Sequence, residues 1–283
     1  MAAAQPSVLI RAIRGPIPRS SITQACQSAR MAALSLLNKQ LDAELNLRAV
    51  PDYPGALNGL QLQNRSGQVR RIVAAVDACL PVVRAAAAQP GPVLLLVHHG
   101  MFWSGAQCVT GPVFEKLEAA MQADMAIYSA HIPLDLHPRL GNNAVLAKAL
   151  SFAKTVPFFD WKGIKLGVRA AVNLTREALV KKLTAAVGGP VHVCAGGPAK
   201  VRNVGIITGG AGSEIAAIAA TGVDTFITGE GPHWSYTAAE ELGVNLLYGG
   251  HYATETFGVK AAAAWLAAKH RLPWEFIDHP TGL

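Results

Sequence analysis

Two short stretches of the sequence each place a histidine four residues before a carboxylate, directly after a run of apolar residues. His131 precedes Asp135 in the first stretch, and His251 precedes Glu255 in the second. Residues four apart share one face at the start of a helix, so each histidine and its carboxylate should point the same way. We call each of these histidine–carboxylate segments a corner. Two corners in one chain suggest that two halves of the chain converge on a single site.

A pair of adjacent histidines, His98 and His99, follows four apolar residues and precedes Gly100. Neighbouring side chains on a strand point to opposite faces, but where the strand breaks at a glycine both imidazoles can turn toward one opening. An isolated histidine is more often a hydrogen-bonded core or surface residue than a ligand. Four histidines and two carboxylates that all follow expected strands are harder to explain in that way, so we interpret them as a site.

Imidazole and carboxylate groups without thiolates are typical ligands of zinc, iron or manganese, and a carboxylate can bridge two cations. Two cations about 3.5–4 Å apart hold a hydroxide at neutral pH and stabilise the charge that develops during attack on carbon or phosphorus. The residues therefore predict two divalent metal ions and hydrolytic chemistry. Glu230 and His233 follow another expected strand. We expect them near the metals as general acid–base groups, with purely structural contacts as the alternative.

The elements that must position these residues alternate between strands and helices. We expect strands over residues 72–76, 93–97, 127–129, 191–194, 204–207, 225–228 and 244–247. We expect helices over residues 31–47, 80–88, 112–122, 142–152, 175–187, 213–220, 235–242 and 255–269. Segment 93–99 matches 225–230 in this order, and 127–131 matches 246–251. The pattern predicts a degenerate duplication and an α/β fold with helix-covered sheets, in which ligands gather beyond the carboxyl ends of strands.

The formal net charge of +7 is concentrated at the start of the chain. Residues 1–30 contain four arginines and no acidic residue, which leaves +3 for residues 31–283. We expect residues 1–30 to be a flexible N-terminal extension. Its composition is shared by organellar transit peptides, and a start codon placed too early, with Met31 as the working start, is a further alternative.

Several classes of protein are disfavoured. No apolar run reaches the roughly 18 residues of a membrane helix, so we expect a soluble protein. The four cysteines are scattered, which argues against a disulfide framework and favours the cytoplasm. Phe158, Phe159 and Trp161 have no flanking basic residues beyond Lys162 and Lys165, so core or subunit contact is favoured over a base-stacking surface and nucleic-acid binding is unlikely. The glycine-rich segment 209–213 predicts a tight turn rather than a phosphate loop, because it lacks either standard spacing.

Five motifs, in order, resemble one known family. They are Asn58-Gly59-Leu60-Gln61, His98-His99-Gly100-x-Phe102-Trp103, Ser129-Ala130-His131-x-x-Leu134-Asp135, Thr228-Gly229-Glu230 and Gly250-His251-Tyr252-x-Thr254-Glu255. From about residue 31 to its end the chain resembles the NGG-one-interacting-factor-three-like family, which includes the YbgI proteins and the type 2 GTP cyclohydrolase I homologues.

The resemblance implies a dinuclear metal site held by His98, His99, Asp135, His251 and Glu255, with His131 close by. It also implies two intertwined repeats, each a mixed β-sheet flanked by helices, and a ring-shaped homohexamer. We assign residues 31–138 and 251–283 to the first repeat, with its closing helix, and residues 139–250 to the second.

The leading functional hypothesis is a metal-dependent hydrolase of the GTP cyclohydrolase type. A metal hydroxide would attack the purine C8, the imidazole ring would open, and formate would leave; His131, Glu230 and His233 are the candidate catalytic residues. The alternative is a metal-binding, metal-delivery or scaffold protein with no substrate of its own. A role as a transcription-related partner rests on the family name alone.

Overall fold

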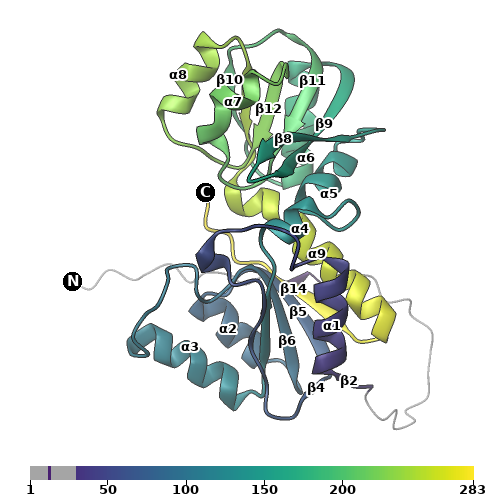
Figure 1. Ribbon diagram of the computed structural model, residues 1–283, viewed down its shortest axis with the longest axis vertical. Helices are drawn as coiled ribbons and strands as arrows, with labels where there is room; N and C mark the ends of the chain where they lie inside the picture. The colour runs from purple at the N-terminus through teal and green to yellow at the C-terminus, as the bar shows by residue number, and fades with distance from the viewer. Residues whose placement is uncertain (1–11, 14–29) are drawn as a thin grey trace.

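A computed structural model describes residues 12–13 and 30–283 of the chain. Two six-stranded mixed sheets lie at opposite ends of an elongated molecule, and helices flank both of them (Figure 1). The predicted α/β class, with two mixed sheets covered by helices, is therefore confirmed. The predicted flexible extension at 1–30 lies outside the described residues, apart from Arg30 and the two-residue strand β1 (Ala12–Ile13).

The first sheet contains four parallel strands, with one antiparallel strand at each edge. Its order is β1, β14 (Trp274–Ile277), β5 (Arg71–Asp77), β6 (Val93–His99), β7 (Ala126–Ser129) and β3 (Gly59–Leu62). A two-stranded sheet pairs β2 (Ala32–Ala33) with β4 (Gln68–Val69). Strands β5 and β6 are buried along nearly their whole length, as expected for parallel strands covered on both faces.

The second sheet has a parallel centre and antiparallel flanks. Its order is β10 (His192–Ala195), β13 (Asn245–Tyr248), β12 (Thr225–Thr228), β11 (Lys200–Ile206), β9 (Ile164–Thr175) and β8 (Val156–Trp161). The β8–β9 hairpin was not among the strands expected from the sequence. It turns at Lys162 and Gly163, which both have positive φ, as the tightest hairpin turns require. Phe158 and Phe159 are buried in the core of this half, so the core interpretation of these rings is correct.

The predicted helices occur in the predicted order, with shifts at their ends, and the short helix α4 was not among those expected. They are α1 (Leu34–Glu44), α2 (Leu80–Ala87), α3 (Gly111–Gln122), α4 (Ile132–Leu136), α5 (Asn142–Ala149), α6 (Arg176–Val187), α7 (Ile215–Ala219), α8 (Trp234–Glu241) and α9 (His251–His270). Two 3₁₀ turns occupy Pro54–Ala56 and Gly212–Glu214. Thr175 caps α6 by accepting a hydrogen bond from the Ala178 N–H, and Gly188 ends that helix with a left-handed residue, as predicted.

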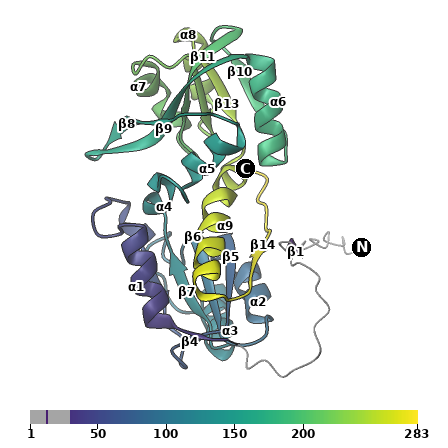
Figure 2. The same cartoon turned by 90° about the vertical axis from the view of Figure 1, so that its right-hand side faces the viewer.

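Helix α9 connects the two ends of the molecule (Figure 2). It begins directly after β13 of the second sheet and packs its buried face, including Val259, Ala263 and Leu266, into the core of the first sheet. The first turn of α9 consequently lies between the two sheets. None of the helices in the described residues is long and apolar enough to cross a membrane.

Candidate metal centre

The carboxyl ends of strands from both sheets meet at one place, and the predicted site residues follow those ends. His98 and His99 are the last residues of β6, and His131 lies between β7 and α4. His251 and Glu255 lie at the start of α9, which begins after Gly250 at a φ of 89°. Such strand ends are where open α/β sheets bind ligands. The two corners and the histidine pair therefore form one cluster.

His98 is completely buried, and one of its ring nitrogens is left without a hydrogen-bond partner among the described residues. Its Nδ1 lies 2.9 Å from the carbonyl oxygen of Ala130. A carbonyl only accepts, so Nδ1 carries a proton. Nε2 lies 3.4 Å from Glu255 Oε1 and 3.6 Å from Asp135 Oδ2. In the neutral ring, Nε2 is therefore a buried lone pair that faces two carboxylates.

The other three histidines of the cluster repeat this arrangement with a carboxylate at Nδ1. The pairs are His99 Nδ1 with Asp77 Oδ1 at 2.8 Å, His131 Nδ1 with Asp52 Oδ1 at 2.8 Å, and His251 Nδ1 with Glu230 Oε1 at 2.7 Å. Histidines that ligate metals usually donate their second N–H to such a group, which fixes the ring and its tautomer. All four imidazoles are thus oriented with Nε2 available to the site.

Glu255 occupies the centre of the cluster and is only 2% exposed. Its Oε1 lies 3.2 Å from His251 Nε2, and its Oε2 lies 3.4 Å from His99 Nε2. Oε2 has no hydrogen-bond partner among the described residues. The two carboxylate oxygens therefore face different histidines, which is the geometry that a bridging carboxylate needs.

Asp135 lies on the other side of His98 and is held by polar neighbours. Its Oδ1 accepts hydrogen bonds from Asn142 Nδ2 at 2.7 Å and from Thr208 Oγ1 at 3.3 Å. These contacts leave Oδ2 directed at His98. The aspartate is thus oriented by the first residue of α5 and by a residue that follows β11.

Burial and charge act in opposite directions on the pKa values of the cluster. Burial alone would lower the pKa of His98, but the carboxylates of Asp135 and Glu255 raise it to about 10. Burial likewise opposes protonation of His251, yet Glu255 and Glu230 raise its pKa to about 9. Burial would raise the pKa of Glu255, and the surrounding histidines hold it well below its usual range. Burial raises the pKa of Asp135, although the charges of His98 and His131 oppose this. Protons on His98 and His251 thus balance the carboxylate of Glu255.

The residues present fit a metal-binding role. In each of two groups of three residues, the ligand atoms all lie within 4.8 Å of one another. The groups are His98, His99 and His131, and His99, His251 and Glu255. Two unpartnered buried atoms, His98 Nε2 and Glu255 Oε2, face this space. A buried polar atom without a partner is costly, and a cation would satisfy both atoms at once. These clustered side chains could therefore hold metal ions.

The structure separates the three residues predicted to be catalytic. His131 lies in the cluster, with its ring 4.9 Å from that of His98. Glu230 contacts His251 through Nδ1, on the side away from the cluster. His233 does not fit its predicted place near the metals, because its side chain is exposed at the start of α8 and lines neither pocket of the site. Pro232 and the turn into α8 carry it away from the strand end.

Sequence reasoning missed the two aspartates that hold histidines, Asp52 and Asp77. Asp52 also accepts hydrogen bonds from the Ile132 N–H and from Asn58 Nδ2, and Asn58 accepts one from the His131 N–H. Asn58 begins the first of the five sequence motifs, and the structure shows that it binds the His131 backbone. The polar residues of this turn-rich segment were the sequence signal for the contact, because Asp and Asn side chains in turns often bind backbone groups.

The glycine-rich segment after β11 is a tight turn against the cluster, as the sequence indicated. Gly209 has a φ of 74°, and a β-carbon at this position would clash with Glu255 Oε1. Its N–H donates to Thr254 Oγ1 at 3.1 Å. The glycine therefore makes room for the central carboxylate.

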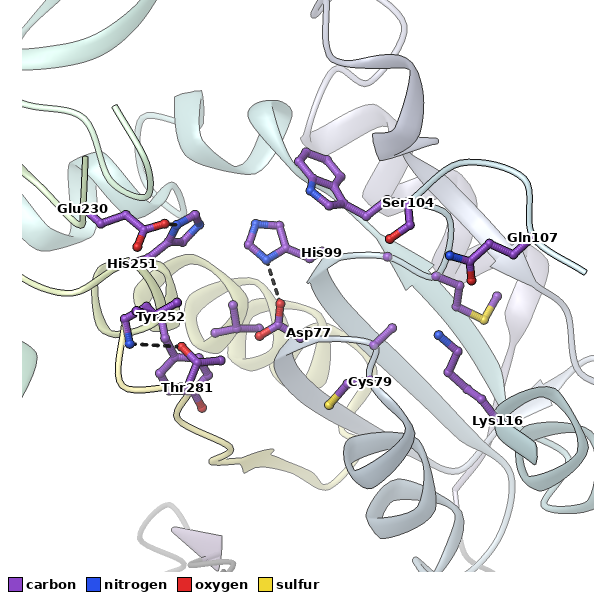
Figure 3. A pocket seen from close by; sticks show the side chains of 16 residues that line it. Asp77, Cys79, His99, Ser104, Gln107, Lys116, Glu230, His251, Tyr252 and Thr281 are labelled. Carbon is purple, nitrogen blue, oxygen red and sulfur yellow. Dashed lines mark hydrogen bonds and ion pairs between the residues drawn. The ribbon is translucent and has the colours of Figure 1, made fainter. Parts of the chain in front are cut away.

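Two pockets open on the cluster and share His99, Trp103 and His251. The larger, about 410 Å³, extends past Asp77 and Cys79 toward α3 (Figure 3). The smaller, about 270 Å³, is lined by Tyr53, Trp161 and the turn after β11. A small molecule could therefore approach the cluster from either side of the Trp103 ring.

The model of the Duf34/NIF3 (NGG1p interacting factor 3) family matches residues 37–281. The chain belongs to this family. A member from Deinococcus radiodurans named GTP cyclohydrolase 1 type 2 homolog is 43% identical over 249 residues, which cover 87% of this chain and 93% of that protein. A member of the same name from Halobacterium salinarum is 40% identical over 240 residues, covering 83% and 94%.

Solved structures of Duf34/NIF3 relatives share the fold. TTHA1606 from Thermus thermophilus has a TM-score of 0.80 and 37% identity, covering 89% of this chain and 100% of that chain. Protein ybgI, described as of unknown function, has a TM-score of 0.82 and 32% identity over the same shares of the two chains. The resemblance seen in the five motifs is thus confirmed.

Proposed function

We propose that this Duf34/NIF3 protein is a metal-dependent hydrolase of the GTP cyclohydrolase type. The observation that carries the proposal is the convergence of three Nε2 atoms, those of His98, His99 and His251, on the buried carboxylate of Glu255. The names of the relatives support the choice of substrate. We assign the ligands as predicted, with two divalent ions of zinc, iron or manganese held by His98, His99, Asp135, His251 and Glu255.

The bound ions would supply a Lewis acid and a water activated for attack at neutral pH. Glu255 would hold both ions, because its two oxygens face different histidines. Asp77 and Glu230 would fix the tautomers of His99 and His251, so Glu230 acts as a positioning residue rather than as an acid or base.

His131 is the proposed general acid–base group. Its Nδ1–H donates to Asp52, so Nε2 can accept a proton from water and later return it to the leaving nitrogen. Asp52 would stabilise the imidazolium that forms. Burial acts to raise the pKa of Asp52, but its contacts with His131, Asn58 and the Tyr53 N–H together lower it. Trp103, whose ring lies 4.5 Å from that of His131, would exclude water from this side.

The direct test uses protein loaded with manganese, iron or zinc, incubated with GTP while formate and the pterin product are followed. Turnover that is lost in His98→Ala and Glu255→Ala supports the proposal. Lack of turnover with every metal, or equal turnover by the two variants and the unaltered protein, overturns it. Two tightly bound metals per chain without hydrolysis would instead favour the alternative of a metal-delivery or scaffold protein.

We further infer a duplicated chain that assembles as a ring-shaped hexamer in the cytoplasm. The parallel strands β5, β6 and β7 correspond in order and direction to β11, β12 and β13, which supports the two intertwined repeats.

Exposed apolar side chains around α3, namely Val109, Phe114 and Met121, support subunit contact. Cys79, Cys108 and Cys194 are free thiols, which suits a reducing compartment. Light scattering of the purified protein tests the hexamer.

A further inference from the structure

Lys116 is a half-buried lysine of α3 that lines the larger pocket beside the metal-ligand cluster. Burial lowers the pKa of its ammonium, and among the described residues only the thiol of Cys79 opposes that change. No acidic side chain of the described residues pairs with it, whereas Lys165, for example, is paired with Asp160. A partly desolvated cation without a counter-charge is costly, and in a pocket wall it marks a place for an anion.

The larger pocket joins this cation to the metal-ligand cluster. His99, Glu230 and His251 lie at one end, and Lys116 extends from the opposite wall with its ammonium directed into the pocket (Figure 3). Ser104 and Gln107 lie on the loop above Lys116 and add a hydroxyl and an amide. The volume of about 410 Å³ is within the range of sites that hold small organic ligands.

The acidic side chains of this pocket are both at the cluster end and both engaged. Asp77 holds His99, and Glu230 holds His251. The terminal carboxyl group of Leu283 also lines the pocket, and it accepts a hydrogen bond from the Tyr252 N–H at 3.2 Å at the cluster end. An anion beside Lys116 would therefore have a cation and neutral donors as its nearest neighbours. Between the two ends, the wall is formed by apolar side chains such as Val76, Ala78 and Met101. The pocket is thus polarised, with a metal-ligating end, an apolar middle and a cationic end.

We propose that Lys116, assisted by Ser104 and Gln107, binds the phosphate group of a phosphorylated substrate whose other end reaches the metal centre. Lysine is a compact point charge that suits phosphate, and the hydroxyl and amide donors match its remaining oxygens. The assignment of the far end rests on the proposed function; the phosphate site itself does not. A site at Lys116 would place the phosphate chain of a nucleotide away from the reacting atoms, where the phosphates contribute binding and orientation.

The first experiment measures binding of inorganic tripolyphosphate to manganese-loaded protein by calorimetry, with the metal content checked after each titration. Lys116→Met should weaken binding about 10- to 100-fold, the usual effect of losing one charged hydrogen bond. Lys116→Arg should keep most of the affinity, and Lys148→Met, which removes an exposed lysine of α5, should leave it unchanged. No binding by the unaltered protein, or equal weakening by Lys116→Met and Lys148→Met, overturns the proposal.

A second probe, the dicarboxylate glutarate, separates phosphate from carboxylate recognition. Tighter Lys116-dependent binding of tripolyphosphate supports the phosphate assignment, and tighter Lys116-dependent binding of glutarate overturns it. Formate release from GTP distinguishes this proposal from the cyclohydrolase proposal. Lys116-dependent binding of tripolyphosphate without formate release retains the phosphate site and rejects the cyclohydrolase. Formate release with the same KM for GTP in Lys116→Met and in the unaltered protein retains the cyclohydrolase and rejects the phosphate site.

Discussion

His98 Nε2 and Glu255 Oε1 lie 3.4 Å apart at a point where His98 is fully buried and Glu255 is 2% exposed. The two residues come from β6 of the first sheet and from the start of α9, far apart in the chain. Removing one member of a buried charge pair leaves the other without compensation, which is more damaging than the pair is stabilising. The metal-free fold should therefore depend on this contact.

Glu255→Gln should lower the free energy of unfolding of the metal-free protein by about 3 kcal/mol, because His98 would lose a compensating charge. Urea unfolding in the presence of a chelator measures this change. Glu118→Gln, which removes an exposed carboxylate from α3, is the matched control and should change stability by less than about 0.5 kcal/mol. Equal stabilities of the two variants would contradict the central role of Glu255.

Metal affinity should rise with pH. The pKa values of His98 and His251 are raised to about 10 and about 9, so both rings are protonated at neutral pH in the metal-free protein. Metal binding must displace these protons, which gives up to about a 100-fold gain in affinity per pH unit below pH 9 for two protons. A competing chelator titration between pH 6 and pH 9 measures the slope. A slope near zero would show that binding is not coupled to these protons.

The same protons have the opposite effect on the metal-free fold. A histidine whose folded pKa is raised stabilises the fold fully below its unfolded value of 6.5, and that stabilisation is lost as pH rises through about 9 to 10. Unfolding of the metal-free protein between pH 6.5 and pH 10 should show this decline. His98→Asn should flatten it, since the asparagine does not titrate.

Gly209→Ala should weaken metal binding about tenfold or more, because its β-carbon would displace Glu255 Oε1. Gly222→Ala is the matched control. Gly222 also has a positive φ, of 82°, but nothing lies within 4 Å of the position that a β-carbon would take there. Both substitutions should cost about 1 kcal/mol of stability through the backbone, and only Gly209→Ala should change metal affinity. Equal metal affinities in the two variants would contradict the close approach to Glu255.

His131→Ala should retain two metals per chain and lower turnover about 10²- to 10⁴-fold, as expected for a general acid–base group. Metal analysis and formate release, measured on the same preparation, separate the two effects. His233→Ala removes an exposed histidine outside the cluster and should leave both measurements unchanged. Loss of one metal in His131→Ala would show that His131 is a ligand.

The sequence by itself determined where most of the strands and helices form and which kinds of side chain follow the strand ends. Apolar runs such as 72–76 and 93–97 indicate buried strands without any knowledge of their partners, since a short run of consecutive apolar residues is typical of a strand covered on both faces. The four-residue spacing of His251 and Glu255 places both on one helical face by local geometry alone. The β8–β9 hairpin escaped prediction because its long second strand mixes exposed and buried positions.

Only the tertiary structure decided which of these residues meet. Helix α9 starts at the second sheet and packs on the first, and this crossing brings Glu255 to His98 and His99. It also decided that Asp52 and Asp77 hold histidines and that His233 lies outside the cluster. The physical reason is that strand and helix formation depends on neighbours in sequence, whereas a cluster of ligands depends on how distant elements pack.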